Sequence, residues 1–237
     1  MLILENVSKN YGSFRALDGV ELLVPSASVF ALPGPNGSGK TTLLKIVLGL
    51  VKPQRGARIT LDGQSIESRE YRSSIVYMPQ VPNFMPHLKV KELISLVQQL
   101  RQQDAVREEE LIHDLGIGRF WNRRFGDLSG GMKQKVNILQ ALMFDFSLAV
   151  LDEPTASLDP GVAYYLKSLI HRLADEEKTI LFTSHIMSEV QEMADVMALL
   201  VNGKLLLTES PDKFTRSSGC DTLEKAVLEY WKDCHAN

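Results

Sequence analysis

The sequence predicts an α/β fold with a mostly parallel sheet, an N-terminal antiparallel β region and an inserted helical subdomain. Three observations lead to this prediction. Short apolar runs alternate with amphipathic helical segments, which is typical of parallel sheets covered by helices. A glycine-rich loop stands between one apolar run and a helix, and a long interval in the middle of the chain has helical spacing alone.

The N-terminal part is expected to consist mainly of strands. Residues 2–7 alternate in polarity, and residues 16–24 look like their antiparallel neighbour. Residues 28–32 form a short apolar run that ends at the glycine-rich loop, and the apolar residues after this loop recur with helical spacing. Four later apolar runs are expected to be further strands: residues 57–63, 73–78, 147–151 and 179–183.

The pattern changes between the strands near residues 78 and 147. Residues 82–144 are expected to form a helical subdomain inserted in the core, because helical spacing persists there and strand signals are absent. Beyond it, Asn202-Gly203 between two apolar runs predicts a β-hairpin. Residues 209–237 are expected to form a short C-terminal helical tail, and residues 1–237 together a single domain.

Composition limits the partners that the chain is expected to have. The 26 Lys and Arg residues nearly balance the 29 Asp and Glu residues, and no long basic block occurs, so no nucleic-acid partner is expected. The N-terminus lacks the pattern of a secretory signal, and the longest apolar runs fall far short of the ~20 residues of a membrane-spanning helix. The chain is therefore expected to be cytoplasmic, with any membrane role supplied by a partner.

Residues 34–41 match the pattern G-x-x-x-x-G-K-[ST] of a phosphate-binding loop. Glycines let backbone N–H groups wrap phosphate, and the start of the following helix adds its dipole. We expect Lys40 to neutralise the β- and γ-phosphates of a bound nucleotide and the Thr41 hydroxyl to ligate Mg²⁺. The residues expected to bind nucleotide here are Gly34, Pro35, Asn36, Gly37, Ser38, Gly39, Lys40, Thr41 and Thr42.

An acidic pair follows the apolar run at residues 147–151. Asp152 ends a buried strand, where a carboxylate needs a cation or hydrogen-bond donors, and Mg²⁺ held by the loop is the expected partner. Glu153 is expected to polarise a water molecule aimed at the γ-phosphate. Gln80 and His185 also follow predicted strands, and open α/β sheets bind their ligands at such strand ends.

A second helix start with phosphate-binding character lies in LSGGMKQKV, residues 128–136. Ser129 is a good N-cap residue, and the exposed N–H groups of such a helix start attract phosphate. The glycine-rich loop is already expected to bind phosphate, so the residues by themselves do not explain the second site.

With LSGGM added to the earlier motifs, the chain resembles the nucleotide-binding subunit of an ABC transporter from about residue 2 to residue 208. The resemblance implies that two such domains pair head to tail. It also implies that Ser129, Gly130 and Gly131 of one subunit close on the ATP held by the other subunit. Asp159, in the motif Ser157-Leu158-Asp159, would contact the facing subunit and help to align its site.

The resemblance implies roles for the remaining residues. Tyr11 stands where family members place an aromatic ring that stacks on adenine, Gln80 resembles the glutamine that touches Mg²⁺ or the attacking water, and His185 resembles the histidine that contacts the γ-phosphate. The segment LSGGM, residues 128–132, resembles the signature motif of the family, in which Met132 replaces the usual glutamine. Gln140 replaces a residue that is commonly basic in the family. Neither residue is expected to touch the γ-phosphate, so an active ATPase is expected. The expected catalytic residues are Glu153, His185, Gln80 and Lys40, and the expected metal ligands are Thr41, Gln80 and Asp152.

The function that the resemblance implies is ATP hydrolysis that drives a separate integral-membrane permease subunit, with similarity to exporters. The dimer partner would be a second copy or a homologous ATPase subunit, and the complex would lie on the inner face of the cell membrane. Phe84 and Met85 fit either a docking groove for the permease or a packed loop. The alternative is a soluble ABC-type ATPase that acts on nucleic acid or ribosomes. Such relatives usually carry fused nucleotide domains, long coiled-coil insertions or zinc-binding cysteines, which this sequence lacks.

Overall fold

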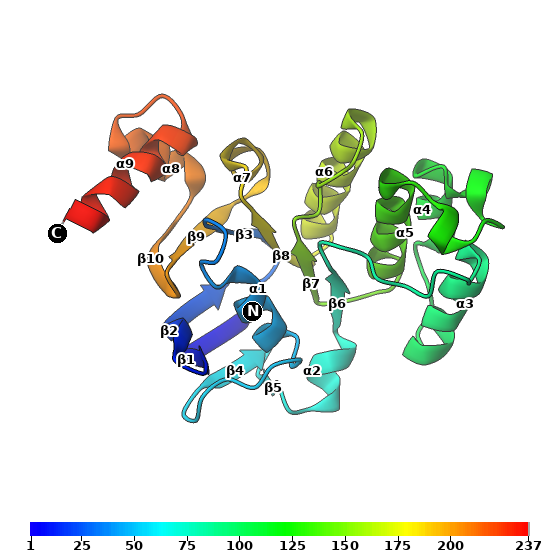
Figure 1. Ribbon diagram of the computed structural model, residues 1–237, viewed down its shortest axis with the longest axis horizontal. Helices are drawn as coiled ribbons and strands as arrows, with labels where there is room; N and C mark the ends of the chain where they lie inside the picture. Colours follow the sequence, from blue (N-terminus) through cyan, green and yellow to red (C-terminus); the bar gives the residue numbers. More distant parts are fainter. Residues whose placement is uncertain (237) are drawn as a thin grey trace.

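The computed structural model describes residues 1–236 and contains two β-sheets with helices between and around them (Figure 1). The strands are β1 (Leu2–Tyr11), β2 (Phe14–Val24), β3 (Val29–Pro33), β4 (Arg58–Leu61), β5 (Gln64–Ser65), β6 (Ile75–Met78), β7 (Leu148–Asp152), β8 (Thr179–Ser184), β9 (Val196–Val201) and β10 (Lys204–Glu209). The α-helices are α1 (Lys40–Val47), α2 (Arg69–Ser73), α3 (Val90–Arg101), α4 (Glu108–Asp114), α5 (Gly130–Leu142), α6 (Pro160–Asp175), α7 (Met187–Met193), α8 (Pro211–Ser218) and α9 (Leu223–Ala236). Two 3₁₀ helices are η1 (Ile117–Phe120) and η2 (Phe125–Asp127).

The larger sheet has six strands in the order β10-β9-β3-β8-β7-β6, and all its pairings are parallel except that of β10 with β9. Its five parallel strands, β9, β3, β8, β7 and β6, are buried on both faces, as their almost continuous apolar sequences predict, whereas β10 at the edge is partly exposed. In β3, for example, Val29 and Ala31 face one hydrophobic core, whereas Phe30 and Leu32 face the other. This confirms the expected α/β class with a mostly parallel sheet.

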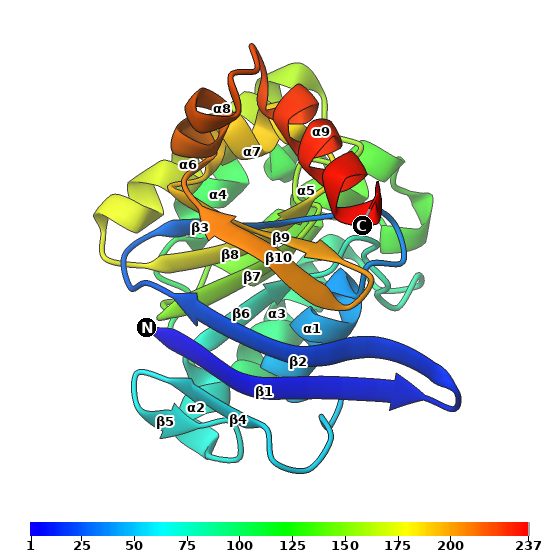
Figure 2. The ribbon, with the colours of Figure 1, turned by 90° about the vertical axis from the view of Figure 1, so that its left-hand side faces the viewer.

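The smaller sheet is antiparallel, with strands in the order β2-β1-β4-β5, and confirms the expected N-terminal β region. Helix α1 lies between the two sheets (Figure 2). Its apolar residues Leu43, Leu44, Ile46 and Val47 are completely buried in one core with residues of both sheets. The helix start at Lys40 is therefore held on a rigid base.

Helices α3, α4 and α5 form the end of the molecule opposite α8 and α9 (Figure 1). Within the described residues, the interval between β6 and β7 contains helices and no strand. The limits 82–144 for a helical subdomain and 209–237 for a tail stay predictions, and residue 237 lies outside the described part of the chain. None of the helices formed by residues 1–236 combines the length and the apolar character that crossing a membrane requires.

Strands β9 and β10 form the hairpin predicted from Asn202-Gly203. Both turn residues have positive φ angles, 48° and 76°, which a type I′ turn requires. The N–H of Gly203 donates to the carbonyl oxygen of Ser38 (2.9 Å), and the N–H of Asp18 donates to the carbonyl oxygen of Gly203 (2.9 Å). A Cβ atom on Gly203 would lie 2.7 Å from the carbonyl oxygen of Ala16, so only glycine fits there. The hairpin turn thus braces the glycine-rich loop against β2.

Candidate functional site

The glycine-rich loop connects the buried strand β3 to α1, as the sequence predicts. Gly37 and Gly39 have φ angles of 80° and 109°, which a residue with a side chain rarely adopts. A Cβ atom on Gly34 would lie 2.2 Å from the carbonyl oxygen of Leu200. The close approach of β9 and the positive φ angles together require glycine in this loop.

Lys40 begins α1, and its side chain folds back into the loop. Its Nζ atom donates to the carbonyl oxygens of Gly34 (2.6 Å) and Pro35 (3.0 Å). Burial lowers the pKa of Lys40, whereas the charges of Glu153 and Asp152 oppose that shift. A cation thus lies at the centre of the loop, close to two carboxylates.

A pocket of about 250 Å³ opens beside Lys40. It is lined by Phe14, Ala16, Asn36, Gly37, Ser38, Gly39, Lys40, Thr41, Thr42, Gln80, Asp152 and Glu153. The structure therefore brings together most of the residues that the sequence assigned to the phosphates, to Mg²⁺ and to catalysis. The Oγ atom of Ser38 is buried and has no hydrogen-bond partner among the described residues. An unsatisfied buried hydroxyl favours a ligand oxygen.

Asp152 ends β7 inside the fold, where its side chain is almost fully buried. The Thr183 hydroxyl donates to its Oδ1 atom (2.6 Å) and accepts the N–H of Glu153 (3.0 Å). Burial raises the pKa of Asp152, while the hydrogen bond from Thr183 opposes this shift. The charged carboxylate is therefore destabilised by its surroundings, which favours a cation at this position.

Replacing Asp152 with Asn is expected to stabilise the protein at pH 7 without added nucleotide or metal. Because the pKa is raised on folding, the folded state binds more protons than the unfolded state at pH values between the ordinary value of 3.8 and the raised one. Stability therefore falls as the pH rises through this window. Asn keeps an acceptor for Thr183 without a charge, so we expect Tm to rise by about 2–4 °C, on the order of 1 kcal/mol.

Scanning calorimetry at pH 7 measures this change. Asp145→Asn is the matched control, because a hydrogen bond from Lys178 lowers the pKa of Asp145 and its loss should give no stabilisation. A Tm of the Asp152 variant at or below that of the wild type contradicts the electrostatic argument.

Glu153 joins the two polar residues that follow neighbouring strands. The Nε2 atom of Gln80 donates to its Oε2 atom (2.7 Å), and Nδ1 of His185 lies 2.9 Å from its Oε1 atom, which places a proton on Nδ1. Glu153 also has a φ angle of 48°, a strained conformation for a residue with a side chain. Side chains that follow β6, β7 and β8 therefore meet at one carboxylate.

Two residues near this site were not expected from the sequence. Glu189 of α7 accepts the hydroxyls of Thr155 (2.7 Å) and Ser184 (3.1 Å), so it ties together the segments that carry Glu153 and His185. No local pattern marks this residue.

Phe14 is the second residue that the sequence analysis missed. It lines the pocket and pairs directly with Tyr11 across the β1–β2 turn. The side chains of Tyr11 and Phe14 are 48% and 60% exposed. The two aromatic residues on either side of Gly12-Ser13 were the available signal for this pair.

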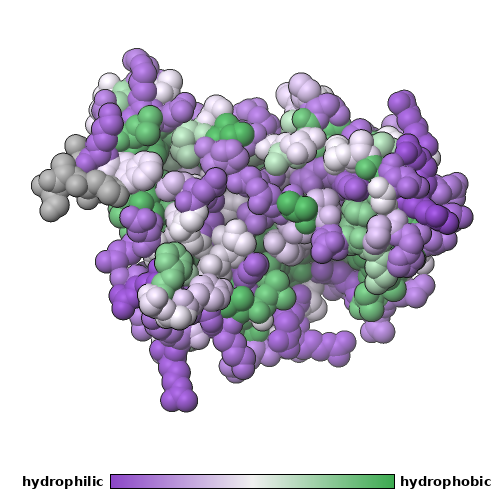
Figure 3. Space-filling model, viewed as in Figure 1, coloured by the Kyte–Doolittle hydropathy of each residue, from purple (hydrophilic) through white to green (hydrophobic). Residues whose placement is uncertain are grey.

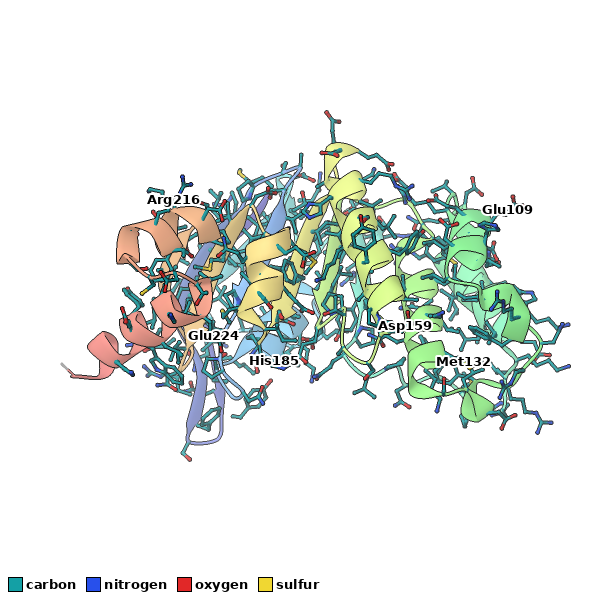
Figure 4. The ribbon with its side chains drawn as sticks, turned by 90° about the horizontal axis from the view of Figure 1, so that it is seen from above. Glu109, Met132, Asp159, His185, Arg216 and Glu224 are labelled. Carbon is teal, nitrogen blue, oxygen red and sulfur yellow. The ribbon has the colours of Figure 1, made fainter. Side chains whose placement is uncertain are left out.

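The second helix start lies apart from this pocket. Ser129 caps α5 by accepting the N–H of Met132 (3.4 Å), and Asp159 caps α6 by accepting the N–H of Val162 (3.0 Å). In Figure 4 Met132 and Asp159 lie on the same side of His185. A Cβ atom on Gly131 would lie 3.4 Å from the carbonyl oxygen of Ser157, so the signature lies against the segment that ends at Asp159. The lining of the pocket beside Lys40 includes neither Asp159 nor the helix start formed by Ser129, Gly130 and Gly131.

The model of the ABC transporter family matches residues 17–156. This chain belongs to the ABC transporter family. It is 35% identical over 212 residues to a probable sulfate/thiosulfate import ATP-binding protein CysA of Chlorella vulgaris, which covers 86% of this chain and 89% of the relative. It is 33% identical over 226 residues to the Nod factor export ATP-binding protein I of Burkholderia orbicola (strain AU 1054), with 92% and 74% covered.

Solved structures of the family share the fold. The structure of an ATP-binding subunit of an ABC transporter superposes with a TM-score of 0.89 at 26% identity, covering 97% of this chain and 99% of that one. A dimeric bacterial ABC transporter cassette has a TM-score of 0.78 at 26% identity, with 89% and 98% covered. The chain is therefore the ATP-binding cassette of an ABC transporter, and its ATP hydrolysis energises transport. The named relatives include importers and exporters, so they do not fix its substrate.

Proposed function

We propose that two copies of this cassette, or one copy and a homologous ATPase subunit, hydrolyse MgATP at shared sites and thereby drive a separate integral-membrane permease. The observation that carries this proposal is the convergence of Gln80 and His185 on Glu153 at the pocket of Lys40. The signature residues lie elsewhere on the same chain, where they are available to a neighbour.

The pocket suits the triphosphate of ATP. Loop N–H groups, the Ser38 hydroxyl and Lys40 would bind phosphate oxygens, and Lys40 would exchange the carbonyl oxygens of Gly34 and Pro35 for them. Tyr11 would stack on adenine, with Phe14 beside it on the same hairpin.

Mg²⁺ fits the donor set near Lys40. We assign Thr41, Gln80 and Asp152 as its ligands, because a buried carboxylate with a raised pKa needs a cation. Among the described side chains, those of residues 1–232, no group of three or more His, Cys, Asp and Glu residues could hold a metal ion. One carboxylate with neutral oxygens and substrate phosphates is, however, a usual environment for Mg²⁺, which supplies charge neutralisation in phosphoryl transfer.

Glu153 would accept a proton from the water that attacks the γ-phosphate. Gln80 contacts one of its oxygens and His185 the other, and the two contacts would keep the carboxylate oriented. His185 would also donate to the γ-phosphate, which requires it to leave Glu153.

The second half of each site would come from the facing subunit. Ser129, Gly130 and Gly131 of that subunit would present their hydroxyl and N–H groups to the γ-phosphate, and Asp159 would help to align the interface. Support comes from the dimeric cassette among the similar structures.

The surface for the permease would lie at the helical end of the cassette, on the cytoplasmic face of the membrane. Phe84 packs edge-on against Phe125 (5.3 Å between ring centroids), so it belongs to the packed loop, whereas Met85 is 52% exposed. The segment that follows Met85 pairs with the segment that carries Arg123, because the N–H of Val90 donates to the carbonyl oxygen of Arg123 (3.0 Å). These two segments contribute the charged residues Lys91 and Arg123. Figure 3 shows that this end of the molecule is largely hydrophilic, with smaller apolar areas. We therefore assign Met85 as an apolar anchor within a polar rim.

Met85→Glu is expected to reduce capture of the permease subunit by at least about tenfold, because a carboxylate would be buried in an apolar contact. The tagged cassette and the permease are co-expressed and purified in detergent, and the captured permease is quantified. Val106→Glu changes another exposed apolar residue, 62% exposed, and should leave capture unchanged. Equal capture by both variants contradicts the assignment of Met85, and capture of ribosomes or nucleic acid instead contradicts the transport function.

A further inference from the structure

Three amide side chains lie at intervals of three residues along α5: Gln134, Asn137 and Gln140. This spacing places neighbours on one side of a helix. Asn137 is completely buried, and Gln134 is 2% exposed. Because a buried amide is costly unless it is hydrogen-bonded, this row requires specific partners.

The partners are backbone carbonyl groups of the segment that leads to Gln80. The Nδ2 atom of Asn137 donates to the carbonyl oxygen of Pro79 (2.7 Å), and the Nε2 atom of Gln140 donates to that of Tyr77 (3.1 Å). Strand β6 contains Tyr77 and is the edge strand of its sheet, so carbonyl groups directed away from β7 need partners from elsewhere. Helix α5 provides these partners.

The amides also bind one another. Asn137 Nδ2 donates to Oε1 of Gln134 (3.3 Å), and Gln140 Nε2 donates to Oδ1 of Asn137 (3.3 Å). Within the described residues, Nε2 of Gln134 is buried without a hydrogen-bond partner. One amide donor of the row is therefore left unused, while the other two amides hold the segment before Gln80.

The segment that Asn137 holds at Pro79 leads directly to the side chains expected to act in catalysis. Gln80 follows Pro79 directly and donates to Glu153, which also binds His185. Proline fixes its own φ angle and has no N–H, so its carbonyl is the one backbone group through which a neighbour can hold it. Helix α5 begins at the other end with Ser129 and Gly130.

We propose that Asn137 and Gln140 are positioning residues, which fasten the backbone before Gln80 to the signature helix α5. Movement of α5 when its start meets a nucleotide then shifts Gln80 relative to Glu153. The start of α5 would meet the ATP held by the facing subunit, whereas Gln80 lies at the ATP site of its own subunit. Nucleotide binding at one site of the dimer would therefore change the position of Gln80 at the other site. This inference rests on the proposed roles of Gln80 and Glu153.

The test compares Asn137→Ala and Gln140→Ala with the wild type in the full-length cassette. We expect Asn137→Ala to lower kcat for ATP about tenfold, as loss of one buried hydrogen bond allows, with KM within about twofold. Gln140→Ala should have a smaller effect in the same direction. Hydrogen–deuterium exchange should become faster in residues 77–88 of both variants, because this segment loses its anchor on α5.

Ile138→Val is the matched control: it removes one buried methylene from the same helix and leaves every amide bond in place. An unchanged kcat or unchanged exchange in residues 77–88 overturns the inference, as does an equal loss of kcat in the control. Gln140 is only partly buried, so Gln140→Ala carries the test if Asn137→Ala does not fold. A wild type that does not hydrolyse ATP contradicts the proposed function itself, whereas normal activity in both amide variants contradicts this inference alone.

Discussion

A Glu153→Gln protein is expected to bind ATP normally and to lose hydrolysis by a factor of about 10²–10⁴, the range for removal of a general base. Glutamine matches glutamate in shape and still offers an oxygen to Gln80, so the pocket should persist. It cannot accept a proton from water at neutral pH. The γ-phosphate should therefore stay in place and hold two cassettes together.

Phosphate release measures the loss of hydrolysis, and size-exclusion chromatography with light scattering measures the dimer. With ATP the variant should elute as a dimer, and with ADP as a monomer. Ser129→Glu in the Glu153→Gln background is the control, because a carboxylate would repel the γ-phosphate of the facing site. Hydrolysis at the wild-type rate would exclude Glu153 as the base. Absence of any ATP-dependent dimer would contradict the shared sites.

Lys40→Ala is expected to weaken ATP binding by at least about 100-fold, since loss of a buried charged partner costs about 2–5 kcal/mol. The substitution removes the cation from a pocket that also contains Asp152 and Glu153. It also leaves the carbonyl oxygens of Gly34 and Pro35 without their donor. Both effects are expected to weaken the binding of the ATP triphosphate.

Isothermal titration calorimetry with MgATP measures this loss. Lys45→Ala removes an exposed cation from the last turn of the same helix and should change the affinity little, so it separates local charge from net charge. Tight binding by Lys40→Ala would refute the role of the loop lysine.

Sequence patterns predict the parallel strands of the larger sheet well, because burial on both faces leaves nearly continuous apolar runs. The runs at 147–151 and 179–183 coincide closely with β7 and β8. Strand ends were equally informative. Gln80, Glu153 and His185 follow three different strands, and parallel pairing of β6, β7 and β8 brings those ends to one edge.

Short and polar elements left weaker signals. Strand β5 has two exposed residues, and α2 is five residues long, so neither spans enough chain for a period to show. Strands β1 and β2 extend into the polar residues around Tyr11 and Phe14, where pairing between the strands maintains the structure. The alternation of apolar and polar residues therefore does not predict how far β1 and β2 extend.

Contacts between distant segments could not be predicted from one sequence. Glu189 joins Thr155 to Ser184, and Asn137 reaches Pro79 across 58 positions. Each is a hydrogen bond fixed by the packing of a helix on the sheet. Local composition around these residues resembles that of any amphipathic helix.

The turn at Asn202-Gly203 makes the shape of the phosphate-binding loop depend on a segment that lies far from it in the sequence. The backbone hydrogen bonds of this turn to Ser38 and Asp18 mean that the docked β9–β10 hairpin supports the shape of the loop. An excised segment carrying residues 34–41 alone would lack this clasp. Nucleotide affinity should consequently appear late in folding, and a bulky residue introduced at position 203 would act as a remote affinity mutation.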